Sequence, residues 1–164
     1  MDHNIALARR LEIEPYTVSV SDLLLTKLQI FRLEDKDIQD VITMLGDVDV
    51  AQEDAPGLIN GRYIGALCAE DWGLFHDVAT NLQRVVESVA AFDIDEVQRE
   101  RIREGVARLI AGLEDAPKCL RWRLRARVGT RKSWHTEVND QEDPLGRDGA
   151  AGRPSSTSRS SRTG

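Results

Sequence analysis

The sequence has 164 residues, of which 41% are hydrophobic and 30% are charged, a balance typical of a globular domain with a real core. The net charge of -6 argues against a protein that binds nucleic acid over its whole surface, and the 5% of aromatic residues argues against a stacking platform for single strands. No apolar run reaches the roughly 18 residues of a membrane span, and from the first residues we expect no secretory signal.

Cysteine and histidine positions indicate no metal site. Cys68 and Cys119 lie far apart and match no metal-ligand spacing, and no histidine lies beside a cysteine or a pair of carboxylates. Reduced thiols are typical of the cytosol. We therefore expect a cytoplasmic protein that does not enter the membrane.

The chain begins with a segment of strand character and continues with helical periodicity. Residues 11–20 partly alternate and are rich in β-branched residues, which predicts a short edge strand containing Pro15. The first helix is expected to end near Leu33 and the second at Gly46, before an acidic loop over residues 47–58. Residues of N-cap type open the successive helices: Ser21, Asp35, Asn60, Asp71 and either Asp93 or Asp95.

After Pro117 the composition becomes basic. Residues 118–132 hold seven basic residues and no acid, and four arginines alternate with other residues: Arg121, Arg123, Arg125 and Arg127. This period of two predicts a strand with one basic face. Residues 132–138 are a candidate second strand. Residues 139–164, rich in Gly, Ser and Arg, are expected to form a disordered tail.

Lys27 has an unusual place on the first predicted helix. On a helical wheel it falls inside a wide apolar arc, while Asp22, Thr26 and Gln29 fall on the opposite side. The arc consists of Val20, Leu23, Leu24, Leu28, Ile30 and Phe31. Such a lysine either extends to the rim of the core or meets a negative partner. Two interpretations stay open: a rim lysine that covers core surface, and an ammonium that binds a phosphate or a carboxylate.

Two aspartates of the second predicted helix are candidate partners in the same chemistry. Asp37 lies at the edge of the apolar face, and Asp40 lies further round. A structural interpretation is equally open, because Asp35 and Asp37 suit the positive end of the helix dipole and Lys36 can pair with Asp40.

The pattern of these residues resembles a known group of enzymes. The run formed by Leu24, Lys27 and Leu28, then Lys36, Asp37, Asp40 and Leu45, resembles nucleotidyltransferase-like proteins of the AbiEii toxin type, in the polymerase-β nucleotidyltransferase superfamily. The run Asp71-Trp72-Gly73-Leu74 is similar to bacterial members. The resemblance covers residues 7 to about 138 and implies a small mixed sheet with flanking helices that transfers a nucleotide from an NTP. It would also allow a helix, in place of a strand, in the basic stretch.

Carried onto this chain, the resemblance implies that Lys27 is the phosphate-binding or active-site lysine and that Asp37, with Asp40, is a later acidic motif. The family's Gly-rich turn and its Asp-x-Asp pair for Mg²⁺ lie upstream of the lysine, and neither occurs before Lys27. We therefore expect residues 1–138 to be a mainly α (α+β) C-terminal helical region with one or two short strands. It would be inactive alone and would use Mg²⁺ and NTP only when completed by the missing half.

The expected partners follow from these two segments. One is a missing N-terminal catalytic half, and another is a second copy paired through the edge strand at residues 11–20. The alternative function is a non-enzymatic helical binding module that holds RNA, DNA or a protein through residues 118–132, with the four alternating arginines as contacts. That stretch could equally be a solvated face, or pair with residues 34–54, which hold eight acids and one lysine.

Overall fold

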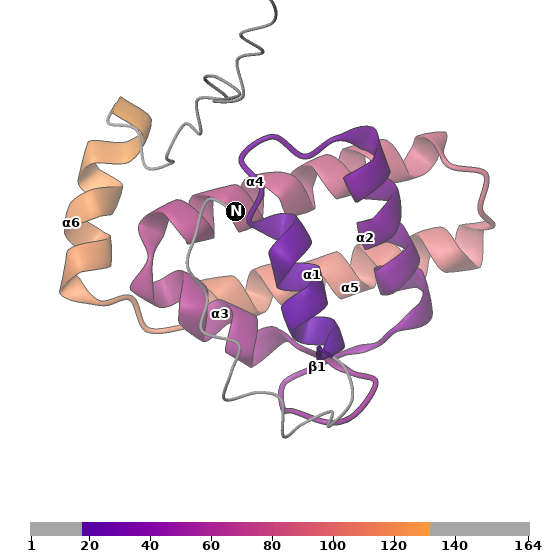
Figure 1. Cartoon of the computed structure of the whole chain (residues 1–164), viewed down its shortest axis with the longest axis horizontal. Helices are drawn as coiled ribbons and strands as arrows, with labels where there is room; N and C mark the ends of the chain where they lie inside the picture. Colours follow the sequence, from indigo (N-terminus) through magenta and orange to yellow (C-terminus); the bar gives the residue numbers. More distant parts are fainter. Residues whose placement is uncertain (1–17, 132–164) are drawn as a thin grey trace, which may run out of the picture.

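Six α-helices account for most of residues 18–131, the part of the chain that the computed structural model describes (Figure 1). The expectation of a mainly helical protein is confirmed. The helices are α1 (Val20–Leu28), α2 (Asp35–Asp47), α3 (Gly61–Glu70), α4 (Trp72–Ser88), α5 (Glu96–Asp115) and α6 (Leu120–Val128), with short 3-10 turns η2 (Val89–Ala91) and η3 (Gly129–Arg131).

The segment between α2 and α3 forms a small parallel sheet. Strands β1 (Val50–Ala51) and β2 (Ile59–Asn60) pair with Val50 opposite Ile59. The acidic loop expected over residues 47–58 is therefore interrupted, because α2 continues through Gly46 to Asp47 and β1 follows. Gly57 has a φ of 70° in the turn before β2, a conformation that a residue without a Cβ adopts at no steric cost.

Helix starts with a local cap were predicted correctly. Asn60 accepts a hydrogen bond from the Tyr63 N–H (3.0 Å), and Asp71 accepts one from the Gly73 N–H (2.7 Å). Of the two candidates for α5, Asp95 is the cap, since it accepts from the Gln98 N–H (2.8 Å). These contacts satisfy N–H groups that the first helical turn leaves unpaired.

The bounds predicted for the first helix are wrong at both ends. Ser19, not Ser21, is the cap, and Ser21 Oγ accepts a hydrogen bond from the Asn60 N–H instead. The helix ends at Leu28 rather than near Leu33, because the amide of Asn81 binds two carbonyls at that end, those of Leu28 (2.9 Å) and Ile30 (2.7 Å). Both reasons are tertiary contacts.

The buried face of α1 is also rotated from the predicted one, by about one residue position. Leu25 is fully buried, whereas Leu23 is 46% exposed. Asp22 and Gln29, expected on the outer side, are each 1% exposed. Asp22 can be buried because hydroxyl groups surround its carboxylate: Ser19 donates to it at 2.5 Å and Tyr63 at 2.7 Å.

The core lies between the long helices α4 and α5 and the shorter α1, α2 and α3 (Figure 1). Its largest fully buried aliphatic side chains come from all five helices: Leu24, Leu25, Leu28, Leu45, Ile64, Leu82, Ile102, Leu109 and Leu113. The closest crossing joins α3 and α5, where Gly65 faces Gly112 backbone to backbone. In contrast, α6 lies at one end of the molecule and contacts only the neighbouring ends of α3 and α4 to any extent.

Several predicted segments lie outside the described residues. These are residues 11–17 of the edge strand, the second strand at 132–138 and the tail at 139–164. Within the described part, the edge strand does not reach residue 20, because Val18 and Ser19 have no regular structure and Val20 begins α1. None of the helices within residues 18–131 combines the length and the apolar character needed to cross a bilayer.

Candidate functional site

The three residues that the family resemblance singles out lie together. Lys27 is in the last turn of α1, and its Nζ lies 2.7 Å from Asp37 Oδ1 and 2.8 Å from Asp40 Oδ2. Asp37 is in the first turn of α2, and Asp40 is one turn further. The side chains are 28%, 19% and 43% exposed, respectively, so the cluster lies at the rim of the core.

Charge stabilisation within this cluster is mutual. Hydrogen bonds from the ammonium, first to Asp37 and then to Asp40, raise the pKa of Lys27. The same ammonium lowers the pKa of Asp40. Lys27 and Asp40 are therefore both charged near neutral pH, and the ammonium links α1 to α2. Both interpretations of Lys27 hold in part, since it lies at the rim and also meets carboxylates.

The cluster does not fit a magnesium–nucleotide complex. The ammonium that would bind a phosphate already contacts two carboxylates. Across residues 18–131, no group of three or more His, Cys, Asp or Glu side chains could hold a metal ion. The geometry favours a structural ion-pair cluster.

Replacing Lys27 with methionine is expected to lower the free energy of unfolding at neutral pH by no more than about 1 kcal/mol. The loss should shrink as the pH falls through the depressed pKa of Asp40, because the pair stabilises the fold only while that carboxylate is ionised. It should also shrink as the pH rises through the raised pKa of Lys27. Urea unfolding across the pH range measures the stability loss and its decrease on the acidic and on the alkaline side.

Arg62→Met is the control for that series, since Arg62 is an exposed cation on α3, outside the cluster. Its unfolding free energy should follow the wild-type pH profile. A Lys27→Met variant whose deficit is the same at every pH would contradict an electrostatic role for Lys27.

The second group of candidate residues lies on a helix rather than on the expected strand. Residues 120–128 form α6, whose N-cap is Cys119. Three side chains at helical spacing turn toward α4: Lys118, Trp122 and Arg125. Trp122 packs edge-on against Phe75 at 5.2 Å, and Arg125 lies 4.8 Å from the centre of the Trp72 ring.

The period of two in the sequence misled because arginine and tryptophan both combine an apolar stem with a polar end. Such residues are compatible with either face of a helix or a strand. The contacts with α4 decide for a helix, because the contacting residues Lys118, Trp122 and Arg125 are four and three positions apart, which is helical spacing.

The opposite side of α6 is exposed and has both apolar and basic character. Its three large apolar residues recur every four positions, and Leu120, Leu124 and Val128 are 73%, 53% and 43% exposed. Exposed arginines flank this stripe. We call the surface formed by these six residues the α6 outer face: Leu120, Arg121, Arg123, Leu124, Arg127 and Val128.

Three of the four predicted arginines therefore share a surface, while Arg125 is held inward. Within residues 18–131 no salt bridge joins Arg121, Arg123 or Arg127 to a carboxylate, so these three arginines do not pair with the acidic residues 34–54. The apolar stripe was missed in the sequence because, on a strand, Leu124 and Val128 lie on the face opposite the alternating arginines.

The polar residues buried around α1 were also missed as a group. Asp22, Tyr63 and Asn81 come from three helices, and their hydrogen bonds join positions more than forty residues apart. No local sequence signal marks such pairs. These hydrogen bonds fix the position of α1 and therefore of Lys27. The α6 outer face remains the exposed candidate for binding.

The sequence matches no protein-family model, and no curated protein and no solved structure matches it.

Proposed function

We propose that this protein is a non-enzymatic helical binding module that holds a protein partner on the α6 outer face. The supporting observation is the stripe of Leu120, Leu124 and Val128 exposed on one side of α6. Three large apolar side chains in one row gain free energy when a partner removes them from water. Isolated apolar side chains are common on protein surfaces and would not by themselves indicate a binding site.

The arrangement of charge favours a protein partner over a nucleic acid. The apolar residues occupy the centre of the surface and the arginines its flanks, which is the order of an apolar core and a polar rim in protein interfaces. A surface for phosphates would instead place its cations at the centre of contact. The net charge of -6 also opposes approach of a polyanion.

The same arginines indicate the charge of the partner. Arg121, Arg123 and Arg127 form no salt bridge among residues 18–131, so carboxylates of a partner would be their complement. We therefore expect an acidic surface with an apolar centre. The proposal includes a cytoplasmic location, which suits two free cysteines.

Chemical crosslinking of the tagged chain inside its own cells, followed by size-exclusion chromatography, tests this proposal. The wild type should elute as part of a larger assembly, and Leu124→Glu should elute as the free chain, since a carboxylate at the centre of the stripe opposes burial. Leu23→Glu is the matched control, because Leu23 is an equally exposed leucine on α1, at 46%. Assembly that survives in Leu124→Glu would contradict the proposal, and assembly that nuclease dissolves would identify a nucleic acid instead.

The convergence of Lys27, Asp37 and Asp40 is the one observation that favours a second candidate, a nucleotidyltransferase-like chain completed by an upstream half. The purified chain alone is expected to transfer no label from NTP in the presence of Mg²⁺. Transfer that Lys27→Ala and Asp37→Ala both abolish would support this second candidate and count against a purely structural cluster.

A further inference from the structure

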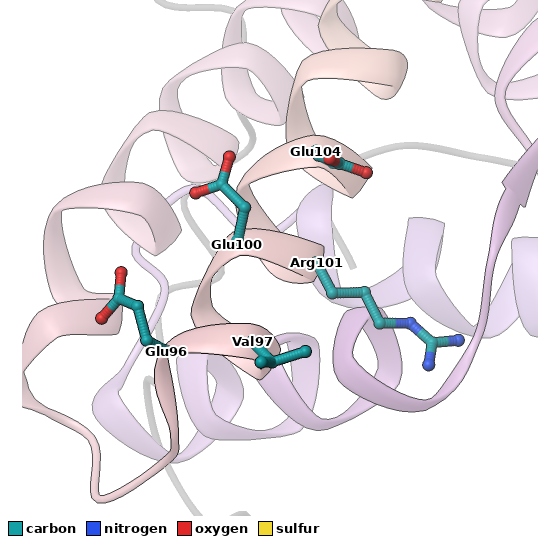
Figure 2. A pocket seen from close by; sticks show the side chains of 5 residues that line it. All are labelled: Glu96, Val97, Glu100, Arg101 and Glu104. Carbon is teal, nitrogen blue, oxygen red and sulfur yellow. The ribbon is translucent and has the colours of Figure 1, made fainter.

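The most exposed large apolar side chain of the described residues lies at the far end of the molecule from α6. Val97, in the first turn of α5, is 79% exposed, the largest exposure among the large apolar side chains of the described residues. It lies in an open hollow of about 480 Å³ whose remaining lining is Glu96, Glu100, Arg101 and Glu104. We call these five residues the α5 hollow (Figure 2).

The α5 hollow has the periodicity and the charge that complement the α6 outer face. Its glutamates recur every four residues along α5 (Figure 2), as do the apolar residues of α6. Two parallel or antiparallel helices with the same repeat can therefore keep their rows in register. Three carboxylates and one guanidinium line the hollow. On the α6 outer face, by contrast, every charged side chain is an arginine.

Neighbouring arginines of α5 already pair with these glutamates, in contacts at the protein surface. Arg103 and then Arg99 lower the pKa of Glu96, so this carboxylate is ionised near neutral pH. Arg103 also contacts Glu100 at 3.3 Å, and Arg108 contacts Glu104 at 3.5 Å. All of these pairs are exposed, and exposed pairs contribute little, so the glutamates can exchange partners at small cost. Arg101 is directed to Asp49 at 3.1 Å.

The positions of the two surfaces prevent contact within one chain. In Figure 1, α6 lies at one end of the long axis, and α5 begins at the other end, after the turn from α4. A copy of the chain can therefore use its α6 outer face only on the hollow of another copy.

We propose that the partner of the α6 outer face is a second copy of this chain, which receives α6 in its α5 hollow. This inference rests on the proposed function and names its partner. Leu124 would cover Val97, and the flanking arginines would meet the glutamates. The contact joins two different surfaces, so each complex leaves one surface free at either end and association continues with concentration. One nine-residue helix buries a small area, so the contact should be weak and salt-sensitive.

Sedimentation equilibrium of the full chain from micromolar to millimolar concentration tests this inference. The average mass of the wild type should rise above the 18.3 kDa of one chain at low salt and return toward it at high salt. Leu124→Glu blocks α6, and Val97→Glu blocks the hollow. Each variant alone should remain a monomer, and their equimolar mixture should form a dimer and stop there, because each partner retains one complementary surface. Leu23→Glu should associate like the wild type.

The outcomes separate this inference from the proposed function. A wild type that stays monomeric, a Val97→Glu variant that associates normally, or a mixture that forms no dimer would each overturn self-association through these surfaces. If the cellular assembly is still lost in Leu124→Glu, the binding module stands with a different partner. If it persists, the proposed function fails as well.

Discussion

Replacing Gly65 with alanine should lower the free energy of unfolding by about 2 kcal/mol. A Cβ at this position would lie 2.8 Å from the carbonyl carbon of Gly112 and nearer still to its oxygen. Both atoms belong to the backbone of α5, so no side chain can turn away to make room. The helices must separate, and the loss of packing exceeds the gain of about 1 kcal/mol in helix propensity from glycine to alanine.

The same substitution elsewhere separates crowding from propensity. Gly46 lies inside α2, and a Cβ there would meet only the Ile102 Cδ1 atom, at the ordinary distance of 4.0 Å. Gly46→Ala is therefore expected to raise stability by up to about 1 kcal/mol. Urea unfolding followed by helical circular dichroism measures both variants. If Gly65→Ala stabilised the protein as Gly46→Ala does, α3 and α5 could not approach backbone to backbone at Gly65 and Gly112.

Asn81→Leu should lower the free energy of unfolding by about 3 kcal/mol. The Asn81 amide donates to the carbonyls of Leu28 and Ile30, and its side chain is 1% exposed. Leucine has a similar volume but no donor, so two carbonyls at the end of α1 would lose their partner away from water. The end of α1 carries Lys27, so hydrogen exchange should also increase around that residue.

Gln83→Leu is the control for Asn81→Leu on the same helix. Gln83 is exposed, and it donates only to the exposed Glu87 at 3.1 Å. Its replacement should change stability by less than about 0.5 kcal/mol. Equal effects of the two substitutions would show that the hydrogen bonds of Asn81 do not determine where α1 ends.

Features with a local cause were predictable from the sequence. The caps Asn60, Asp71 and Asp95 act within three residues of themselves, so composition and spacing were enough to place α3, α4 and α5. Lys27 was also singled out from spacing, and its carboxylate partners lie on the next helix.

Features decided by distant contacts were not predictable. The orientation of α1 depends on Tyr63, which makes the burial of Asp22 possible, and its end depends on Asn81. On α6, the packing of Lys118, Trp122 and Arg125 against α4 distinguishes a helix from a strand in a run of alternating arginines. The apolar stripe of the candidate binding surface was missed for that reason, since the stripe exists only at helical spacing.

Site-specific photo-crosslinking in the native cells tests the central claim, that the α6 outer face holds a protein. A photoreactive residue at position 124 should give a defined crosslinked protein, which charge reversal at Arg123 and Arg127 weakens. The same residue at the exposed position 83 of α4 should give none. Position 124 is itself 53% exposed, so failure to crosslink there could not be attributed to burial. Equal or absent crosslinking at both positions would contradict the account.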